Sequence, residues 1–378
     1  MFETLSHTAL QHYWWILVSL LGAILVFLLF VQGGQSLIYQ LGKTADSRKL
    51  ILNTVGSKWE FTFTTLVTFG GAFFASFPLF YSTSFSGAYW VWFLILLAFV
   101  VQAVSYEFRS KPENLLGTKT FDAFLFVNGL LGTILLGAAV STFFTGSNFT
   151  IDSQRHSEWT MASRGLEAAL NIQNLSLGLA VFFLSRVLAI LYFFNTISNG
   201  EVIASSRKHL LYNAIPFVVF FLMFVGFLIF SEGFAVDPVS GAVTMERFKY
   251  LHNLIQMPLV LVLFLIGVVL VLSGIIMPVV SFDKSRDKAI WMAGIGTILT
   301  VFSLFLVAGF NNTAFYPSVA DLQSSLTIAN SSSSHYTLTA MSYVSLFIPF
   351  VLAYIVYAWR AINNKKADVK DLEKEHVY

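Results

Sequence analysis

The sequence predicts an all-α polytopic membrane protein with about nine transmembrane helices, and three observations support this fold class. Hydrophobic residues make up 56% of the chain and charged residues only 11%, whereas soluble domains carry about 25% charged residues. The mean hydropathy is +0.74. Apolar stretches of about 20 residues, long enough to cross the hydrocarbon core, recur along the chain. We therefore expect residues 1–378 to form a single integral membrane domain.

Each predicted span is an apolar stretch that charged, aromatic or turn-forming residues bound. Tyr13–Trp15 and Tyr89–Trp90 place aromatic rings at span ends, where such rings favour the interface between lipid and water. Pro349 lies inside the last span and predicts a kink there. We expect these helices to form two four-helix bundles and one peripheral helix. In chain order the predicted spans are 13–39, 60–81, 88–106, 120–144, 175–197, 211–231, 257–280, 288–309 and 338–359.

The distribution of Lys and Arg predicts the orientation of the chain. One set of alternate connecting segments holds 17 of these residues, the other set holds 4, and Arg186 lies inside a span. Positive residues gather on the cytoplasmic side of membrane proteins. The N-terminus is therefore expected outside and the C-terminus inside, with residues 360–378 as a short cytoplasmic tail. Three longer segments, about 144–174, 232–256 and 310–337, are expected to be outer loops.

The residue types that bind haem or metal are missing from the predicted membrane interior. The chain has no Cys, and its seven His residues fall in loops, tails or span edges. A haem in a helical bundle takes an imidazole, thiolate or thioether ligand from a span, and the Met residues here fit apolar packing. We therefore expect no haem and no metal to be bound by ligands of this chain. The seven are His7, His12, His156, His209, His252, His335 and His376.

Glu60 is a carboxylate at the mouth of the second span, directly after Trp59. In one interpretation the helix dipole stabilises this first-turn carboxylate by about 0.3–1 kcal/mol, with Lys58 as a neutralising neighbour. In the other, Glu60 collects protons from the inner side. The sequence by itself favours the first interpretation. The glycine pairs Gly33–Gly34 and Gly70–Gly71 are expected to permit close helix contact.

Three other charged residues are candidates for structural or interface roles. Arg186 is the one charge well inside a span, where such residues face a partner or a water-filled cavity. We expect it to form an ion pair, a subunit interface, or a contact with a quinone or lipid headgroup. Glu107 and Arg109 end the third span, as an interfacial ion pair or headgroup contact, or in ordinary positive-inside anchoring. Asp122 begins the fourth span and fits a helix-start carboxylate.

Four stretches near the two ends of the sequence together form a specific pattern. They are Trp14–Trp15; Leu41–Gly42 with Arg48–Lys49, Asn53 and Trp59–Glu60; Gly70–Pro78 with Tyr81, Phe85–Gly87 and Glu107–Lys111; and Tyr316–Ser318 with Leu326–Ile328, Ser331–Ser334 and Thr337–Leu338. This combination resembles subunit II of cytochrome bd-type quinol oxidases. The resemblance is clearest over residues 41–111 and 310–378 and weak between them.

The resemblance implies a heterodimer in a bacterial inner (plasma) membrane. Subunit I of this family carries haems b and d and the quinol-oxidising loop, so no catalytic residue is expected in this chain. Together the two subunits couple quinol oxidation to reduction of O2 to water, and they generate a proton gradient for aerobic respiration. The resemblance also implies membrane lipids, small single-helix accessory subunits and a bound structural quinone or lipid as further partners, and no nucleic acid.

The resemblance also bears on the Trp59–Glu60 pair. The family implicates the acidic residue after this tryptophan, more often Asp, in a proton path towards the haems. The acidic Asp-Gly-Phe-Asp-type motif that usually ends the first span is absent, and Gln32–Gln35 stands there without an acid. Glu60 then carries inner-side proton uptake alone, or the uptake runs through subunit I.

Two alternatives from other classes stay open at this point: a secondary transporter and a purely structural membrane subunit. A transporter is expected to show inverted repeats, broken helices and polar clusters near the midplane. Only Arg186 is charged at depth, and this disfavours transport.

Overall fold

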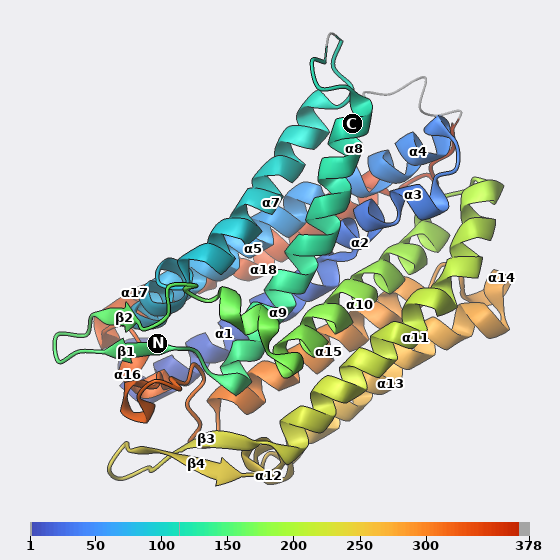
Figure 1. Cartoon of the computed structure of the whole chain (residues 1–378). Coiled ribbons are helices and arrows are strands. Elements are labelled where there is room, and N and C mark those ends of the chain that lie inside the picture. Colours follow the sequence, from blue (N-terminus) through green and yellow to red (C-terminus); the bar gives the residue numbers. More distant parts are fainter. Residues whose placement is uncertain (1, 113, 370–378) are drawn as a thin grey trace.

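The computed structural model describes residues 2–112 and 114–369, and it is a bundle of long helices (Figure 1). Within this part of the chain, 8 helices are long and apolar enough to cross a membrane, and a bent helix pair raises the number to 9. The predicted fold class and number of spans are thus confirmed. Which end of the chain lies outside the membrane stays a prediction.

The first half of the chain supplies four of the spans. Ser6 caps the first helix by accepting a hydrogen bond from the backbone of Ala9, so this helix begins at His7 and not near residue 13. Three of these spans include more than one helical segment. The segments are α1 His7–Leu28, α2 Phe30–Ser36, α3 Ile38–Leu41, α5 Trp59–Ser76, α7 Tyr89–Phe108, α8 Thr118–Val127, the π-helical turn η3 Asn128–Gly132 and α9 Thr133–Thr145.

The second predicted span begins where expected, at the start of α5, but it ends earlier than predicted. A further helix, α4 Ala45–Gly56, precedes it, with Thr44 as its cap. Apolar stretches do not reveal α4, because half of its residues are polar. The span itself ends at Ser76, and the chain bends by 119° into Pro78–Ser86. Pro78 has no N–H to continue the helical bonding, so it begins a new short helix.

The second half holds four long helices and one interrupted helix. Asn199 caps the helix that begins at Gly200, well before the predicted start at residue 211. The predicted kink near Pro349 is a short interruption at Leu346–Phe347, with Pro349 in the first turn of the next helix. The helices are α10 Ile172–Thr196, α11 Gly200–Phe230, α13 Pro258–Val280, α15 Ala289–Gly309, α17 His335–Ser345 and α18 Ile348–Ile362.

The connecting segments divide between two ends of the bundle (Figure 1). One end, here called the hairpin end, carries two antiparallel pairs, β1 Phe149–Ile151 with β2 Ser157–Trp159, and β3 Glu232–Val236 with β4 Val243–Arg247, beside α12 Lys249–Gln256 and α16 Ile328–Ser331. The opposite end carries α4, α14 Phe282–Ser285 and the last turn of α18. Most Lys and Arg residues lie here, so we call it the basic end. All three predicted outer loops lie at the hairpin end.

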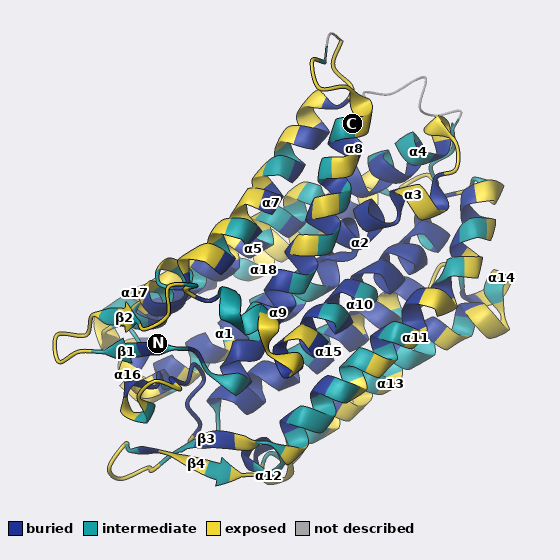
Figure 2. Ribbon diagram, in the orientation of Figure 1, coloured by how far each residue is buried: buried dark blue, intermediate teal, exposed yellow. Residues whose placement is uncertain are grey.

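Helix α10 is the centre of the molecule. It is buried along nearly its whole length (Figure 2), and it packs on α2, α9 and α11. Helix α1 packs on α5 and α15, and α13 packs on α15. By chain order we call the spans from α1 to α9 one helix group and α10, α11, α13 and α15 the other, with α17–α18 at the periphery. Helices of the two groups pack extensively on one another, so the expected division into two four-helix bundles stays a prediction.

The two groups meet most closely where α2 crosses α10 at Gly33. A Cβ atom added to Gly33 would overlap the carbonyl oxygen of Ser185 and lie 2.6 Å from the backbone nitrogen of Arg186. The neighbouring Gly34 faces Val55 of α4 at 2.6 Å. Gly71, by contrast, has nothing within 4 Å in the described part of the chain. Of the two glycine pairs, only the first makes the close helix contact that the sequence suggested.

Replacing Gly33 with Ala tests this crossing. We expect a loss of about 1–3 kcal/mol of stability, because the added methyl group must push two backbones apart. Thermal unfolding of the purified protein measures the change. Gly226→Ala in α11 is the control, since a Cβ there meets nothing within 4 Å. If Gly33→Ala were as stable as the control, backbone contact at this crossing would be the wrong explanation for the glycine.

Candidate functional site

Glu60 lies in the first turn of α5 with its side chain exposed. Within the described residues its carboxylate has no hydrogen-bond or ion-pair partner. The expected neutralising neighbour, Lys58, turns away from it. The Lys58 side chain is completely buried, donates a hydrogen bond to Ser57 Oγ at 3.2 Å and lies 5.2 Å from the ring centroid of Trp359. An ion pair with Lys58 therefore does not account for the carboxylate at position 60.

Trp59 points into the bundle, in contrast to Glu60. Its ring stacks on Tyr106 of α7, with centroids 6.0 Å apart and an interplanar angle of 16°, and it also meets Phe63. The indole N–H of Trp59 is buried and has no acceptor in the described residues. The two adjacent candidates thus face different surroundings: Trp59 is part of the helix packing, and Glu60 faces outward.

Glu60 heads an exposed stripe along α5. Residues that alternate by four and three positions share one face of a helix, and the stripe contains Glu60, Thr64, Val67, Gly71 and Phe74, all exposed. We call this stripe the α5 face. Beside it, a groove of about 460 Å³ between α5 and α7 has an almost entirely apolar lining. A carboxylate therefore stands at the edge of an apolar surface that lipid or another subunit must cover.

Four buried carboxamides and a tyrosine form a polar layer inside the bundle. Gln32 Nε2 donates to Gln102 Oε1 at 2.8 Å, and Gln35 Nε2 donates to the Tyr106 hydroxyl at 3.0 Å. The two bonds join α2 to α7 one helical turn apart, because each helix supplies residues three or four positions apart. Asn128, buried at the start of η3, completes the set. We call these five residues the amide layer.

Several atoms of the amide layer have no protein partner among the described residues. They include acceptors (Gln32 Oε1, Gln35 Oε1) and a donor (Gln102 Nε2), and both polar atoms of Asn128. An unsatisfied buried polar group costs about 1–3 kcal/mol, so ordered water is the natural partner for donors and acceptors alike. Gln32 and Gln35 stand where the resemblance led us to expect acids. Their uncharged amides can hydrogen-bond water but do not accept or release protons themselves.

Arg109 and Asp122 form a buried ion pair between α7 and α8. Arg109 Nε lies 2.6 Å from Asp122 Oδ1, and the two side chains are only 7% and 6% exposed. Glu107 instead pairs with Lys111 at 3.0 Å on the surface. The suggested pairing of Glu107 with Arg109 is therefore wrong, and Asp122 is more than a helix-start carboxylate. Each of these buried charges needs the other, because a charged group away from water is costly without a partner.

Arg186 is buried in α10, one residue after the crossing with α2. Its guanidinium donates to the side-chain oxygen of Gln40 and lies 5.1 Å from the ring centroid of Phe182. Its Nε has no partner in the described residues, and no carboxylate pairs with it there. Of the predicted alternatives, an ion pair within the described part of this chain is thus excluded. An amide and an aromatic ring stabilise the charge instead.

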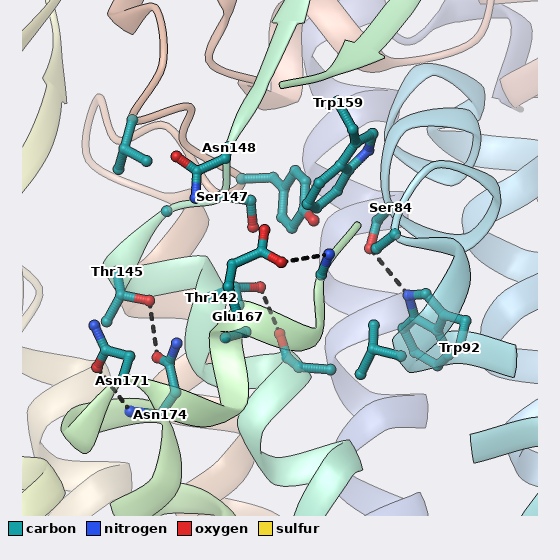
Figure 3. A pocket seen from close by; sticks show the side chains of 18 residues that line it. Ser84, Trp92, Thr142, Thr145, Ser147, Asn148, Trp159, Glu167, Asn171 and Asn174 are labelled. Atoms are coloured by element: carbon teal, nitrogen blue, oxygen red, sulfur yellow. Dashed lines mark hydrogen bonds between the residues drawn. The ribbon is translucent and has the colours of Figure 1, made fainter. Parts of the chain in front are cut away.

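A second polar region lies at the hairpin end. Polar side chains from several segments surround a cavity of about 230 Å³ (Figure 3). Glu167 Oε2 accepts hydrogen bonds from Ser163 Oγ at 2.7 Å and from the backbone of Gly165 at 2.9 Å, while its buried Oε1 has no partner in the described residues. Among the described residues that line this cavity there is no Lys, Arg or His. The cavity is at the opposite end of the bundle from Glu60.

Comparison with known proteins decides the family. The family model for cytochrome bd terminal oxidase subunit II matches residues 10–362. The chain belongs to this family. It is 26% identical over 394 residues to cytochrome bd-I ubiquinol oxidase subunit 2 of Escherichia coli strain K12, covering 97% of this chain and 98% of the relative. It is 27% identical over 364 residues to cytochrome bd ubiquinol oxidase subunit 2 of Bacillus subtilis strain 168, covering 94% and 97%.

The fold is also that of a chain in a solved bd oxidase. A chain in the structure of bd oxidase from Geobacillus thermodenitrificans aligns with a TM-score of 0.61 at 14% sequence identity, covering 94% of this chain and 98% of that chain. The resemblance found in the sequence is confirmed. The protein is thus a multi-pass protein of a bacterial inner membrane and a subunit of a membrane quinol oxidase, whose haem-bearing partner is subunit I.

The residues of this subunit II do not fit a haem iron. None of the described His residues is buried, and in the part of the chain described no three His, Asp or Glu side chains gather as a metal site. Met223, Met277 and Met292 are half-buried among apolar side chains. No pair of axial ligands is therefore available within these spans. His376 lies outside the described residues.

Three features of this subunit II have no counterpart in the sequence predictions: the amide layer, the Arg109–Asp122 pair and the buried Lys58. A signal for the amide layer was present, since Gln102 and Tyr106 are four positions apart on an apolar helix. The ion pair joins two helices across a loop, and sequence spacing does not reveal such contacts. The burial of Lys58 depends on Trp359, which is distant in the sequence.

Asp122→Asn removes the charge that balances the buried guanidinium of Arg109. We expect a loss of about 3–5 kcal/mol of stability, because an uncompensated charge stays in the interior. Thermal unfolding of the assembled oxidase measures it. Glu107→Gln is the control and should cost at most about 1 kcal/mol, since its pair with Lys111 is exposed. Similar losses in the two variants would contradict the importance of burial.

Arg186→Leu removes a buried charge that has only neutral partners among the described residues. We expect a loss of about 1–3 kcal/mol, because the charge-assisted hydrogen bond to Gln40 and the contact with the Phe182 ring are lost, while turnover per haem stays near that of the unmodified complex. Heat and detergent resistance are measured together with quinol oxidase activity. Arg207→Leu, at an exposed position in α11, is the control. A variant that keeps full stability but loses turnover would show that Arg186 has a catalytic and not a structural role.

Proposed function

We propose that this chain is the haem-free subunit II of a cytochrome bd-type terminal oxidase, which supports subunit I and contributes the group that collects protons from the inner side. The complex oxidises quinol, reduces O2 to water and generates a proton gradient, with haems b and d in subunit I. The observation that carries the proton role is the position of Glu60. It is an exposed carboxylate, without a partner in the described residues, at the border of an apolar membrane surface.

The α5 face is the surface that we assign to subunit I. It is apolar below Glu60, and a groove runs beside it between α5 and α7. A partner subunit that covers Val67, Gly71 and Phe74 would leave the Glu60 carboxylate at the mouth of the interface. There it can take a proton from water and pass it into the partner. The positive end of the α5 dipole stabilises its charged form by about 0.3–1 kcal/mol.

The amide layer supports this role because it offers no other group that could collect protons. Its buried polar atoms suit ordered water, but it contains no group that changes charge near neutral pH. The acids that the family usually places at the end of the first span are replaced by Gln32 and Gln35. Glu60 is then the carboxylate of this region on which proton collection depends, and Trp59 holds the start of α5 against Tyr106.

The orientation and the remaining partners belong to the same proposal. We place the basic end on the cytoplasmic side, because most Lys and Arg residues of the described part of the chain lie there. Apolar surface on α11, α13 and α18 suits lipids, a structural quinone and small single-helix subunits. No comparison supports a transporter, since the family model and the curated relatives along nearly the whole chain are oxidase subunits.

Glu60→Gln tests the proton role. Proton transfer by a positioned side chain contributes about 10²–10⁴-fold, and water at the exposed site replaces part of this, so we expect turnover to fall about tenfold. Haem content and assembly should not change. The measurements are oxygen consumption and proton uptake from the inner side of proteoliposomes. Glu107→Gln, also an exposed carboxylate at the basic end, is the control. Unchanged turnover and proton uptake in Glu60→Gln would refute the assignment.

A further inference from the structure

A cavity of about 300 Å³ lies at the basic end, between α4, α10 and the end of α18. Apolar and polar side chains contribute to its wall, among them Leu50, Ser57, Tyr192, Ile362 and Asn363. The Tyr192 hydroxyl donates to Asn363 Oδ1 at 3.4 Å, so α10 and the end of α18 are joined at this wall. Such a mixed lining suits a molecule that is itself part polar and part apolar.

A buried lysine lies directly behind this wall, and burial lowers the pKa of its amine to about 7, so its charged form needs an anion nearby. Lys58 is completely buried, and its amine donates to Ser57 Oγ, which belongs to a residue of the wall. No carboxylate of the described residues pairs with it. A buried lysine without a counter-ion is costly. The ring of Trp359 offsets only part of that cost, because a cation–π contact is a weak substitute for an anion.

The other polar groups of the wall are also rich in donors. Asn363 Nδ2 is buried and has no acceptor in the described residues. Lys365 and Lys366 line the rim, and Lys366 Nζ also contacts Asp287 Oδ1 at 2.6 Å. Among the described lining residues the one carboxylate is Asp368, which accepts hydrogen bonds from Ser198 Oγ and the backbone of Val369. Asp287 and Asp368 offset lysine charge at the rim. The buried Lys58 amine and Asn363 Nδ2, by contrast, have no anion as acceptor in the described part of the chain, and both can donate to one.

Helix α18 leaves room for acyl chains above the cavity. Trp359 is the one buried side chain in α18, every residue of which the structure describes. Its ring packs against Phe30, Phe61, Tyr192 and Trp291. The preceding turns expose apolar side chains on several sides, including Phe350, Leu352, Tyr354 and Val356. Trp359 and the Tyr192–Asn363 hydrogen bond thus fix the end of α18 next to the cavity, and the turns before it leave apolar surface on which acyl chains can lie.

We propose that this cavity binds the phosphate of an anionic phospholipid, with the acyl chains of that lipid along α18. The buried Lys58 and the rim lysines select negative charge, and the Asn363 amide donates to a phosphate oxygen. A lipid is favoured over free phosphate for two reasons: the wall includes Leu50 and Ile362, and the cavity adjoins the exposed apolar side chains of α18. Anionic lipids are also attracted to basic residues at a membrane surface.

The test uses the full oxidase, with this chain and subunit I, freed of lipid in detergent. Phosphatidylglycerol or phosphatidylcholine is added back, and native mass spectrometry counts the molecules retained. We expect one phosphatidylglycerol to be retained selectively. Lys58→Met should lower its retention about fivefold, the effect of one basic residue on an anionic lipid. Lys111→Met, which removes an exposed lysine at the same end, should leave retention unchanged.

Further outcomes distinguish the sources of the anion. If Lys58→Met does not assemble, the double variant Lys365→Gln with Lys366→Gln, at the rim, should show the same selective loss. Equal retention of phosphatidylcholine and phosphatidylglycerol would overturn the proposal, as would equal losses in Lys58→Met and Lys111→Met. Displacement of the lipid by millimolar inorganic phosphate would overturn the lipid as the source and assign free phosphate. None of these outcomes depends on the proton role of Glu60.

Discussion

The structure depends on the contact between the backbones of α2 and α10 at Gly33. No side chain separates the two helices there, so the backbone of Ser185 occupies the space that a methyl group would need. This contact sets the distance between the two helix groups and the rotation of α2. The rotation decides that Gln32 and Gln35 face α7, while Arg186 comes next to the crossing on α10. In a membrane, where apolar side chains gain little from leaving lipid, such close packing is a main source of helix association.

The polar groups of the interior follow from the same geometry. A bilayer offers no water to a side chain that points into it, so every buried polar group must find a partner inside the protein or hold water there. The charges Arg109 and Asp122 solve this by pairing, and Arg186 solves it with an amide and an aromatic ring. Several polar atoms of the amide layer have no partner among the described residues, and the π-helical turn at Asn128 lies in this layer. Such turns are frequent at functional sites, which fits a hydrated region near the proposed proton route.

Much of the fold was predictable from sequence, because a membrane span needs only length and apolar composition. Helix ends such as His7 and Gly200 were misplaced, since their caps lie in polar sequence that a hydropathy pattern treats as loop. Helix α4 was missed for the same reason. The candidate site was predicted in part: Glu60 lies at a helix start and at the basic end, as expected, but its separation from Lys58 was not foreseen. Whether a lysine next to a carboxylate turns towards it or into the core depends on contacts such as Trp359, and these come from the far end of the chain.

The peripheral position of α17 and α18 has a consequence for the order in which the protein is made. A ribosome delivers α17 and α18 to the membrane after all other helices. The crossing of α2 and α10 needs neither of them, so both helix groups can be complete while the C-terminal segment is still in the ribosome. The arrival of Trp359 then closes the ring cluster with Phe30, Phe61 and Tyr192. Truncated chains that lack this segment would therefore be largely folded in the membrane. Cellular quality control would have to recognise the incomplete ring cluster, because both helix groups would be present.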